Sequence, residues 1–260
     1  MRERHAVIFL GAGPGAPELI TVKGQQALAQ AEVILYAGSL VSPAMLGWAR
    51  TGAELVDTAP LHLEQILARM MAAHRAGKRV VRVHSGDTAL FSAMQEQLEV
   101  LEKEGIPCEV IPGVTAAAAA AAALAQEFTL PEITQTVILT RAAGRTPVPE
   151  GETLGGLARH GATMAIYLSA GLIDQVAAEL AAAYGADAPA VVAYRVSWPD
   201  QQIIQGTLAN IAELARQGGI QRQALIIVGP ALAARQARLK ARSKLYDRTF
   251  SHGYRSGSTD

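Results

Sequence analysis

The chain reads VIFLGAGPGA over residues 7–16, an apolar run that ends in a glycine-rich turn. The apolar part predicts a strand that is buried on both faces, as in the middle of a parallel sheet. The turn leaves few side chains at the carboxyl end of that strand, so a flat ligand can approach the backbone. In α/β sheets the ligand crevice lies at this edge, and the stretch therefore predicts a small-molecule site.

Similar short apolar runs continue along the chain, and helix patterns lie between them. The expected strands are Val7–Leu10, Val33–Tyr36, Val80–His84, Glu109–Ile111, Thr136–Thr140, Met164–Leu168, Val191–Tyr194 and Ala224–Gly229. Apolar residues at helical spacing predict helices over Leu61–Ala76 and Leu172–Ala183, and Thr21 and Thr115 are the expected N-caps of two more. Strands that alternate with helices predict an α/β fold with largely parallel sheets.

A second strand–helix series begins after the alanine run at 116–123, which indicates two domains. We expect an N-terminal α/β domain over residues 1–113 and a C-terminal α/β domain over 114–234. Residues 235–260 are basic and then rich in Gly and Ser, and they predict a surface helix followed by a flexible end.

Composition excludes several classes of protein. The 23 basic and 23 acidic residues cancel, which argues against nucleic acid as the main partner. Cys108 is the single cysteine, so an internal disulfide or a Cys-rich zinc site is excluded, and a reducing cytoplasm is expected. The first residues predict no signal peptide, and the longest apolar run, Val114 to Ala125, is shorter than the about 20 residues of a membrane-spanning helix. We expect a soluble protein without a metal site.

The turn after the first strand also satisfies G-x-G-x-x-G/A, the dinucleotide-binding fingerprint. Pro14 stands where the phosphate-binding turn needs a backbone N–H, and proline has none. The second expected strand ends at Tyr36-Ala37-Gly38, without the acidic residue that holds a ribose hydroxyl. A dinucleotide-dependent dehydrogenase is therefore a disfavoured alternative.

Several strings taken together resemble one family, the tetrapyrrole methylases, which build sirohaem and cobalamin precursors. They are GAGPG at 11–15, LITVKG at 19–24, SLV at 39–41, VVRVHSGD at 80–87 and PGVTA at 112–116. Their order and spacing extend the resemblance over about residues 5 to 230. The strings LPEITQTVILTR at 130–141, GRTPVP at 144–149 and SWPD at 197–200 are similar to the branch that methylates C11 of precorrin-4.

The resemblance implies two α/β domains with an inter-domain cleft, S-adenosylmethionine as methyl donor, S-adenosylhomocysteine as product, and a homodimer. It places cofactor contacts at Pro14, Ser85, Gly86, Asp87, Leu90, Thr115, Ala116, Leu168, Val196 and Ala224. Two departures matter. The family often has Asp-Pro where this chain has Asp87-Thr88, and it often has Asp where this chain has Gly38.

Methyl transfer from a sulfonium to a nucleophilic ring carbon depends on alignment more than on acid–base groups. No acid–base constellation stands out in the sequence, and no catalytic side chain is assigned. The macrocycle carries many carboxylates, so we expect cations near it, and Arg141 and Arg145 flank a Gly-containing loop that suits this role. The alternative for both is an ordinary solvated loop.

His62 and Tyr194 are further candidates for the substrate cleft, together with Arg195, which follows Tyr194. For His62 the alternative is a polar residue at a helix end. His84 is expected to be structural. Asp87 either binds the cofactor or shapes its own turn, and the sequence leaves both readings open.

The expected function is transfer of a methyl group from S-adenosylmethionine to C11 of precorrin-4, which gives precorrin-5 on the way to cobalamin. Two alternatives keep the donor and change the acceptor, to cobalt-precorrin-4 of the anaerobic route or to uroporphyrinogen III. A third alternative is a non-catalytic carrier of a tetrapyrrole, because this chemistry demands so few catalytic side chains.

Overall fold

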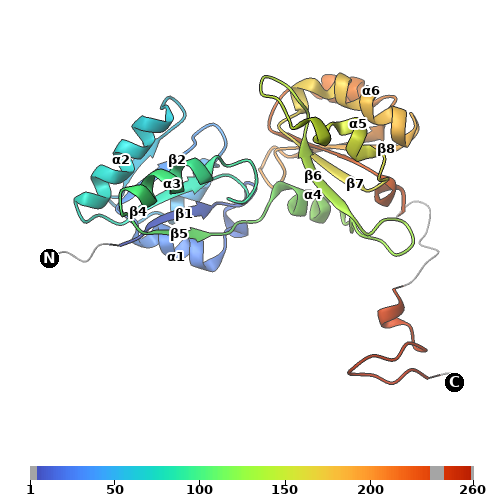
Figure 1. Cartoon of the computed structure of the whole chain (residues 1–260), viewed down its shortest axis with the longest axis horizontal. Helices are drawn as coiled ribbons and strands as arrows, with labels where there is room; N and C mark the ends of the chain where they lie inside the picture. The colour runs from blue at the N-terminus through green and yellow to red at the C-terminus, as the bar shows by residue number, and fades with distance from the viewer. Residues whose placement is uncertain (1–4, 235–242, 259–260) are drawn as a thin grey trace. The chain divides into compact units, whose positions relative to one another are not determined.

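The computed structural model of the protein describes residues 5–234 and 243–258 (Figure 1). The chain forms two compact units. The first holds the residues up to Ala119 together with Arg195–Gln201, and the second holds Ala120–Tyr194 and the chain from Gln202 onward. The division falls inside helix α4 (Ala116–Leu124), close to the boundary expected after residue 113. The division expected from the sequence places residues 195–201 in the second domain, whereas in the structure they belong to the first unit.

The first unit is built on a parallel sheet in the order β3-β2-β4-β1-β5. Its strands are β1 (Val7–Gly11), β2 (Val33–Tyr36), β3 (Glu54–Asp57), β4 (Val80–His84) and β5 (Cys108–Ile111). Its helices are α1 (Val22–Gln30), α2 (Leu63–Arg75) and α3 (Met94–Lys103), with short 3-10 turns at η1 (Pro17–Leu19) and η2 (Pro43–Trp48). All five strands end at one edge, which gathers the loops that follow them.

Helices cover both faces of this sheet, because its central strands are apolar on both sides. Phe9 of β1 is fully buried among residues of α2 and α3, whereas its neighbour Leu10 is fully buried on the face that α1 covers. Figure 1 shows α2 and α3 on one side of the strands and α1 on the other. Thr21 caps α1 as expected, since its hydroxyl accepts a hydrogen bond from the Gly24 N–H at 3.1 Å.

The second unit is built on a sheet in the order β6-β7-β10-β8-β9. Its strands are β6 (Val137–Arg141), β7 (Thr163–Tyr167), β8 (Pro189–Tyr194), β9 (Gln202–Thr207) and β10 (Ala224–Val228). Helices α5 (Leu154–Ala158), α6 (Ile173–Tyr184) and α7 (Ile211–Gln217) contribute buried side chains to one core on this sheet. The short 3-10 turns are η3 (Glu150–Glu152), η4 (Ala170–Leu172), η5 (Pro230–Ala233) and η6 (Lys244–Tyr246).

The α/β class is confirmed, and five of the eight strand pairings described are parallel. The domain bounds stay a prediction. The parallel pairs, however, are concentrated in the first sheet. In the second sheet only β6 and β7 are parallel, while the three other pairs are antiparallel. A parallel pair needs a crossover of about a dozen residues or more, and the connection 195–201 between β8 and β9 is too short for one.

The eight expected strands all form, two with the expected ends and six with ends shifted by at most two residues. The structure adds β3 and β9, both at sheet edges, where charged and polar residues hide the strand pattern. The surface helix expected from Arg235 begins outside the described residues. The described part of the tail forms η6 and a tight turn at His252–Arg255. Within residues 5–234 and 243–258, none of the helices has the length and apolarity required to cross a membrane.

Candidate functional site

Three loops meet at the carboxyl edge of the first sheet, because β4, β1 and β5 are neighbours there. The loops after β1 and β4 are paired through two backbone hydrogen bonds. The Gly13 N–H donates to the Gly86 carbonyl at 3.0 Å, and the Gly86 N–H donates to the Gly13 carbonyl at 2.7 Å. The two glycine-containing loops therefore form one connected backbone surface.

Glycine is required where these loops touch. A Cβ on Gly11 would lie 2.6 Å from the backbone nitrogen of Gly113, and a Cβ on Gly113 would lie 2.2 Å from the Gly86 carbonyl oxygen. Both distances are far below van der Waals contact, and the obstacle is backbone in each case. The bare, side-chain-poor edge expected from the sequence is present at the ends of three neighbouring strands.

Asp87 joins the loop after β4 to the loop after β5. Its Oδ1 accepts a hydrogen bond from the Ala89 N–H at 2.8 Å, and its Oδ2 accepts one from the Gly113 N–H at 2.8 Å. Both carboxylate oxygens are thus used to hold backbone. Of the two readings that the sequence left open for Asp87, these contacts favour shaping of the turn.

Helix α4 begins at the same edge. Its first residue, Ala116, directly follows Thr115, whose carbonyl accepts a hydrogen bond from the Ala119 N–H at 3.2 Å. The structure thus gathers six of the predicted cofactor contacts around these connected loops and the start of α4: Pro14, Ser85, Gly86, Asp87, Thr115 and Ala116. Leu90, half-buried, lies in the loop after β4.

The connection 195–201 also packs on the loop after β1. The Trp198 indole N–H donates to the Pro14 carbonyl at 2.9 Å, and the Ala16 N–H donates to the Ser197 hydroxyl at 2.9 Å. Val196, a predicted cofactor contact, is buried within this connection. Among the sequence motifs, Trp198 belongs only to the string SWPD at 197–200. Nothing local could reveal its role, since 184 positions separate it from Pro14.

The other predicted contacts lie in the second unit, at one edge of its sheet. Ala224 at the start of β10 pairs with Tyr194 at the end of β8, and Arg141 at the end of β6 pairs with Tyr167. Leu168 follows Tyr167 and is 69% exposed. Its backbone φ is 54°, a value that residues other than glycine seldom adopt. The structure therefore places Leu168, Ala224, Tyr194 and Arg141 at a common edge. The inter-domain cleft stays a prediction.

Arg141 and Arg145 differ in what their guanidinium groups contact. Arg141 donates to the carbonyls of Ala142 at 3.3 Å, Thr146 at 3.1 Å and Pro147 at 2.5 Å, so it holds its own loop. Arg145 is exposed, and it has no hydrogen bond or ion pair with any residue in the described ranges. Binding of substrate carboxylates by either arginine stays a prediction, and Arg145 is the one whose charge is not already used.

The two histidines considered from the sequence, His62 and His84, have structural surroundings. His62 lies at the N-cap of α2, exposed, with its Nδ1 2.7 Å from a Glu64 carboxylate oxygen. His84 is buried and stacks on Phe9 at 5.9 Å between ring centroids. Burial, assisted by the positive charge of Arg82, lowers the pKa of His84 to about 3. His84 is therefore neutral at physiological pH and cannot serve as a general acid there.

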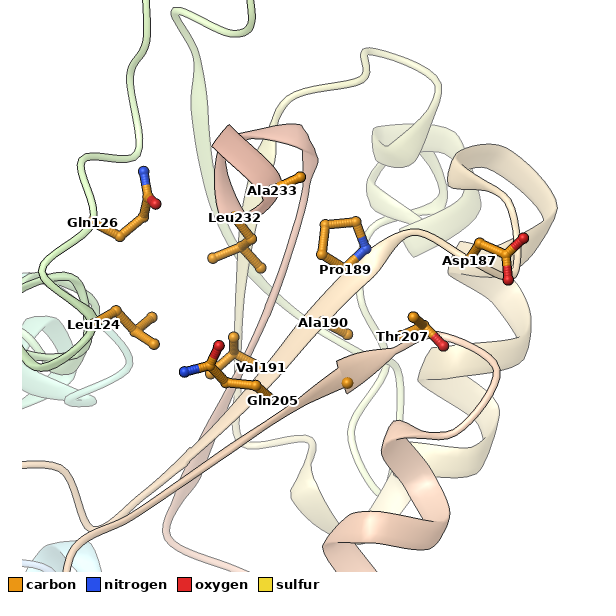
Figure 2. A pocket seen from close by; sticks show the side chains of 11 residues that line it. Leu124, Gln126, Asp187, Pro189, Ala190, Val191, Gln205, Thr207, Leu232 and Ala233 are labelled. Carbon is orange, nitrogen blue, oxygen red and sulfur yellow. The ribbon is translucent and has the colours of Figure 1, made fainter. Parts of the chain in front are cut away.

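A separate cavity of about 420 Å³ lies in the second unit (Figure 2). Its lining includes Pro189 at the start of β8 and Thr207 at the end of β9, which is the end of the sheet opposite Tyr194 and Ala224. None of the predicted contacts lines it. No three metal-ligating side chains cluster anywhere in the ranges that the structure describes.

The comparisons with known proteins agree with this geometry. A family model described as "Tetrapyrrole (Corrin/Porphyrin) Methylases" matches residues 6–212. The chain is 52% identical to a precorrin-4 C(11)-methyltransferase of Pseudomonas aeruginosa, over 96% of this chain and 99% of the relative. It is 49% identical to a cobalt-precorrin-4 C(11)-methyltransferase of Priestia megaterium, over 96% of this chain and 97% of the relative.

Two solved structures are also similar. A cobalt precorrin-4 methyltransferase matches with a TM-score of 0.85 and 48% identity, over 87% of this chain and 95% of that one. A uroporphyrin-III C-methyl transferase of Thermus thermophilus, complexed with S-adenosylhomocysteine, matches with a TM-score of 0.72 and 27% identity, over 92% and 96% of the two chains.

Proposed function

Because the chain belongs to the tetrapyrrole (corrin/porphyrin) methylase family, we propose that it transfers a methyl group from S-adenosylmethionine to C11 of precorrin-4, which gives precorrin-5 in cobalamin biosynthesis. One observation carries most of this proposal. Relatives that share about half of the residues over nearly the whole chain are named for this one reaction, with and without cobalt in the acceptor.

The connected loops of the first unit suit the donor. The sulfonium loses its positive charge as the methyl group leaves, so a carboxylate in contact with it would stabilise the ground state more than the transition state. Asp87 has both oxygens turned to backbone N–H groups, so its carboxylate is already engaged within the loops. Rigid backbone that aligns donor and acceptor in line is the catalytic contribution that this chemistry requires.

We propose that the acceptor is metal-free precorrin-4. The main alternative acceptor is cobalt-precorrin-4. The identities to relatives of the two kinds are close, at 52% and 49%, and they do not separate the acceptors. Uroporphyrinogen III has less support, since the uroporphyrin-III C-methyl transferase structure shares only 27% of its residues with this chain.

The test is a competition among acceptors. Purified protein is incubated with S-adenosylmethionine carrying a labelled methyl group and with precorrin-4, cobalt-precorrin-4 or uroporphyrinogen III in turn. We expect the highest kcat/KM with precorrin-4 over many turnovers. A single stoichiometric binding event without label transfer would instead indicate a tetrapyrrole carrier, and label in uroporphyrinogen III alone would refute C11 methylation.

We also propose that the protein acts as a homodimer in the cytoplasm. The dimer follows from the family resemblance, and the single cysteine is compatible with a reducing compartment. Sedimentation equilibrium of the purified chain tests the dimer, and a single species at the mass of one chain would exclude it.

A further inference from the structure

Both tryptophans of the chain donate their indole N–H to the loop that follows β1. Trp198 donates to the Pro14 carbonyl at 2.9 Å, and Trp48 donates to the Pro17 carbonyl at 3.3 Å. The two contacts differ in depth. Trp198 is half-buried against the glycine-rich part of the loop, whereas Trp48 is 36% exposed and contacts the start of η1.

The Trp198 ring occupies the space that a side chain at position 15 would need. A Cβ on Gly15 would lie 2.1 Å from Cδ1 of the indole and 2.4 Å from its Nε1. The guanidinium carbon of Arg195 lies 4.0 Å from the centre of the same ring, in cation–π contact. The indole is therefore fixed by Arg195 while it contacts the bare backbone of the loop.

The backbone around Trp198 is held in an unusual shape. Arg195 has a φ of 42° and Ser197 a φ of 68°, in the left-handed region that non-glycine residues seldom adopt. The connection keeps this shape through several contacts at once: the Ser197 hydroxyl with the Ala16 N–H, the ion pair of Arg195 with Asp200, and the Trp198 indole with Pro14.

We propose that Trp198 is a positioning residue for the methyl donor. By holding the Pro14 carbonyl and occupying the space beside Gly15, it fixes the loop after β1 before the cofactor arrives. A loop rich in glycine has many conformations to lose on binding, and a loop that is already ordered binds its ligand more tightly. This inference rests on the proposed function, in which that loop binds S-adenosylmethionine.

The first experiment compares Trp198→Phe with Trp48→Phe. Each variant keeps an aromatic ring and deletes one indole donor to the same loop. Isothermal titration with S-adenosylhomocysteine is expected to show a dissociation constant about five- to tenfold higher for Trp198→Phe, the loss typical of one hydrogen bond. Trp48→Phe should stay within about twofold of the wild type, since its contact is longer and more exposed.

Steady-state kinetics distinguish positioning from general damage. We expect Trp198→Phe to raise the KM for the donor while the KM for the acceptor and the melting temperature remain near their wild-type values. A lower melting temperature with equal changes in both KM values would mean that Trp198 is only structural, and would overturn the inference.

The same variants supply a spectroscopic readout. Trp48→Phe leaves Trp198 as the single tryptophan, so its fluorescence reports directly on the contact with Pro14. Because this contact is already formed in the free protein, adding S-adenosylhomocysteine is expected to leave the emission maximum of Trp198 nearly unchanged. A large shift toward shorter wavelength on binding would mean that the contact forms only with the ligand, and would overturn the inference.

A double-mutant cycle completes the test. Gly15→Ala alone should weaken ligand binding strongly, because the new methyl group collides with the indole. In a Trp198→Ala background that space is open, so the additional effect of Gly15→Ala should be much smaller. If the wild type binds no S-adenosylhomocysteine, the proposed function itself fails; if it binds and methylates while the two effects simply add, only the role of Trp198 fails.

Discussion

At the scale of single residues, Asp87 joins two loops of the candidate site. Its two carboxylate oxygens accept from two different loops, at Ala89 and at Gly113. Asp87→Asn keeps one acceptor oxygen and places an amide N–H₂ against a backbone N–H, so one bond is lost. Since hydrogen bonds to charged groups contribute about 1.5–3 kcal/mol, we expect a loss of that order in the free energy of unfolding, together with weaker binding of S-adenosylhomocysteine.

Asp57 provides a matched control for Asp87. It ends β3, and its Oδ1 alone accepts from both the Gly38 N–H at 3.0 Å and the Ala59 N–H at 2.8 Å. In Asp57→Asn the amide oxygen can replace Oδ1 in both bonds, so a much smaller loss is expected. Urea unfolding and calorimetric titration of both variants check this; equal losses would show that the bridge from Asp87 to Gly113 has no special importance.

Arg145 offers the sharper test of acceptor binding, because Arg141 is already engaged by its own loop. Arg145→Ala should raise the KM for the tetrapyrrole about three- to tenfold, as for a partly screened contact with a carboxylate, and leave the KM for the donor and the stability unchanged. Arg141→Ala should lower the melting temperature as well.

Exposed Arg159, at the end of α5, is the control for loss of a positive charge elsewhere on the second unit. If Arg145→Ala and Arg159→Ala have the same kinetics, the loop after β6 does not bind the acceptor.

His84 gives a prediction about pH. The folded protein holds its pKa at about 3, well below the value of 6.5 in an unfolded chain. As the pH falls from about 6.5 toward 3, His84 becomes protonated in the unfolded chain but stays neutral in the folded protein. The free energy of unfolding therefore falls. Within this range the loss in the free energy of unfolding that His84 causes approaches about 1.4 kcal/mol per pH unit.

The variant His84→Phe keeps a ring against Phe9 and removes the titrating group. Its stability between about pH 6 and pH 5 should therefore fall less steeply than that of the wild type, as measured by urea unfolding. His160→Gln, on the exposed surface, controls for loss of a histidine elsewhere. Equal slopes in wild type and His84→Phe would exclude His84 as the source.

At the scale of elements, the meeting of three strand ends depends on glycine. Gly113→Ala would place its Cβ 2.2 Å from the Gly86 carbonyl oxygen and 2.7 Å from that of Gly11, so the strand ends must separate. We expect a loss of about 1–3 kcal/mol in the free energy of unfolding, as for an overpacked core, and impaired donor binding.

Gly151→Ala is the control for this variant, because a Cβ on Gly151 meets nothing within 4 Å. Thermal unfolding of the two variants compares their stability, and Gly113→Ala is expected to have the lower melting temperature. A Gly113→Ala protein as stable as Gly151→Ala would mean that the loops have room to move apart at no cost.

The same scale shows what the sequence could predict. Eight strands could be located because each contains a short apolar run, and in six of them most residues are buried. β3 and β9 could not, because in ELVD and QIIQGT a single apolar pair is flanked by charged or polar residues, as is common at sheet edges. The glycine-rich loops are predictable too, because their glycines stand out in the local composition just as apolar residues do in the central strands.

At the scale of the whole molecule, chain order predicted two α/β units but not their detail. Whether two strands of the second sheet pair parallel or antiparallel depends on which strands are neighbours. The sequence alone does not reveal that order. The connection 195–201 leaves β8, folds with the first unit and returns to β9. Its contacts with Pro14 and Ala16 join positions about 180 residues apart, so only the folded structure reveals them.

The most direct test of the account is the position of the methyl group in the product. The protein is incubated with precorrin-4 and S-adenosylmethionine bearing an isotopically labelled methyl group, and the purified tetrapyrrole is examined by NMR. One labelled methyl group, bonded to C11, is expected. A label on any other ring carbon, or an unmodified acceptor after prolonged incubation, would contradict it.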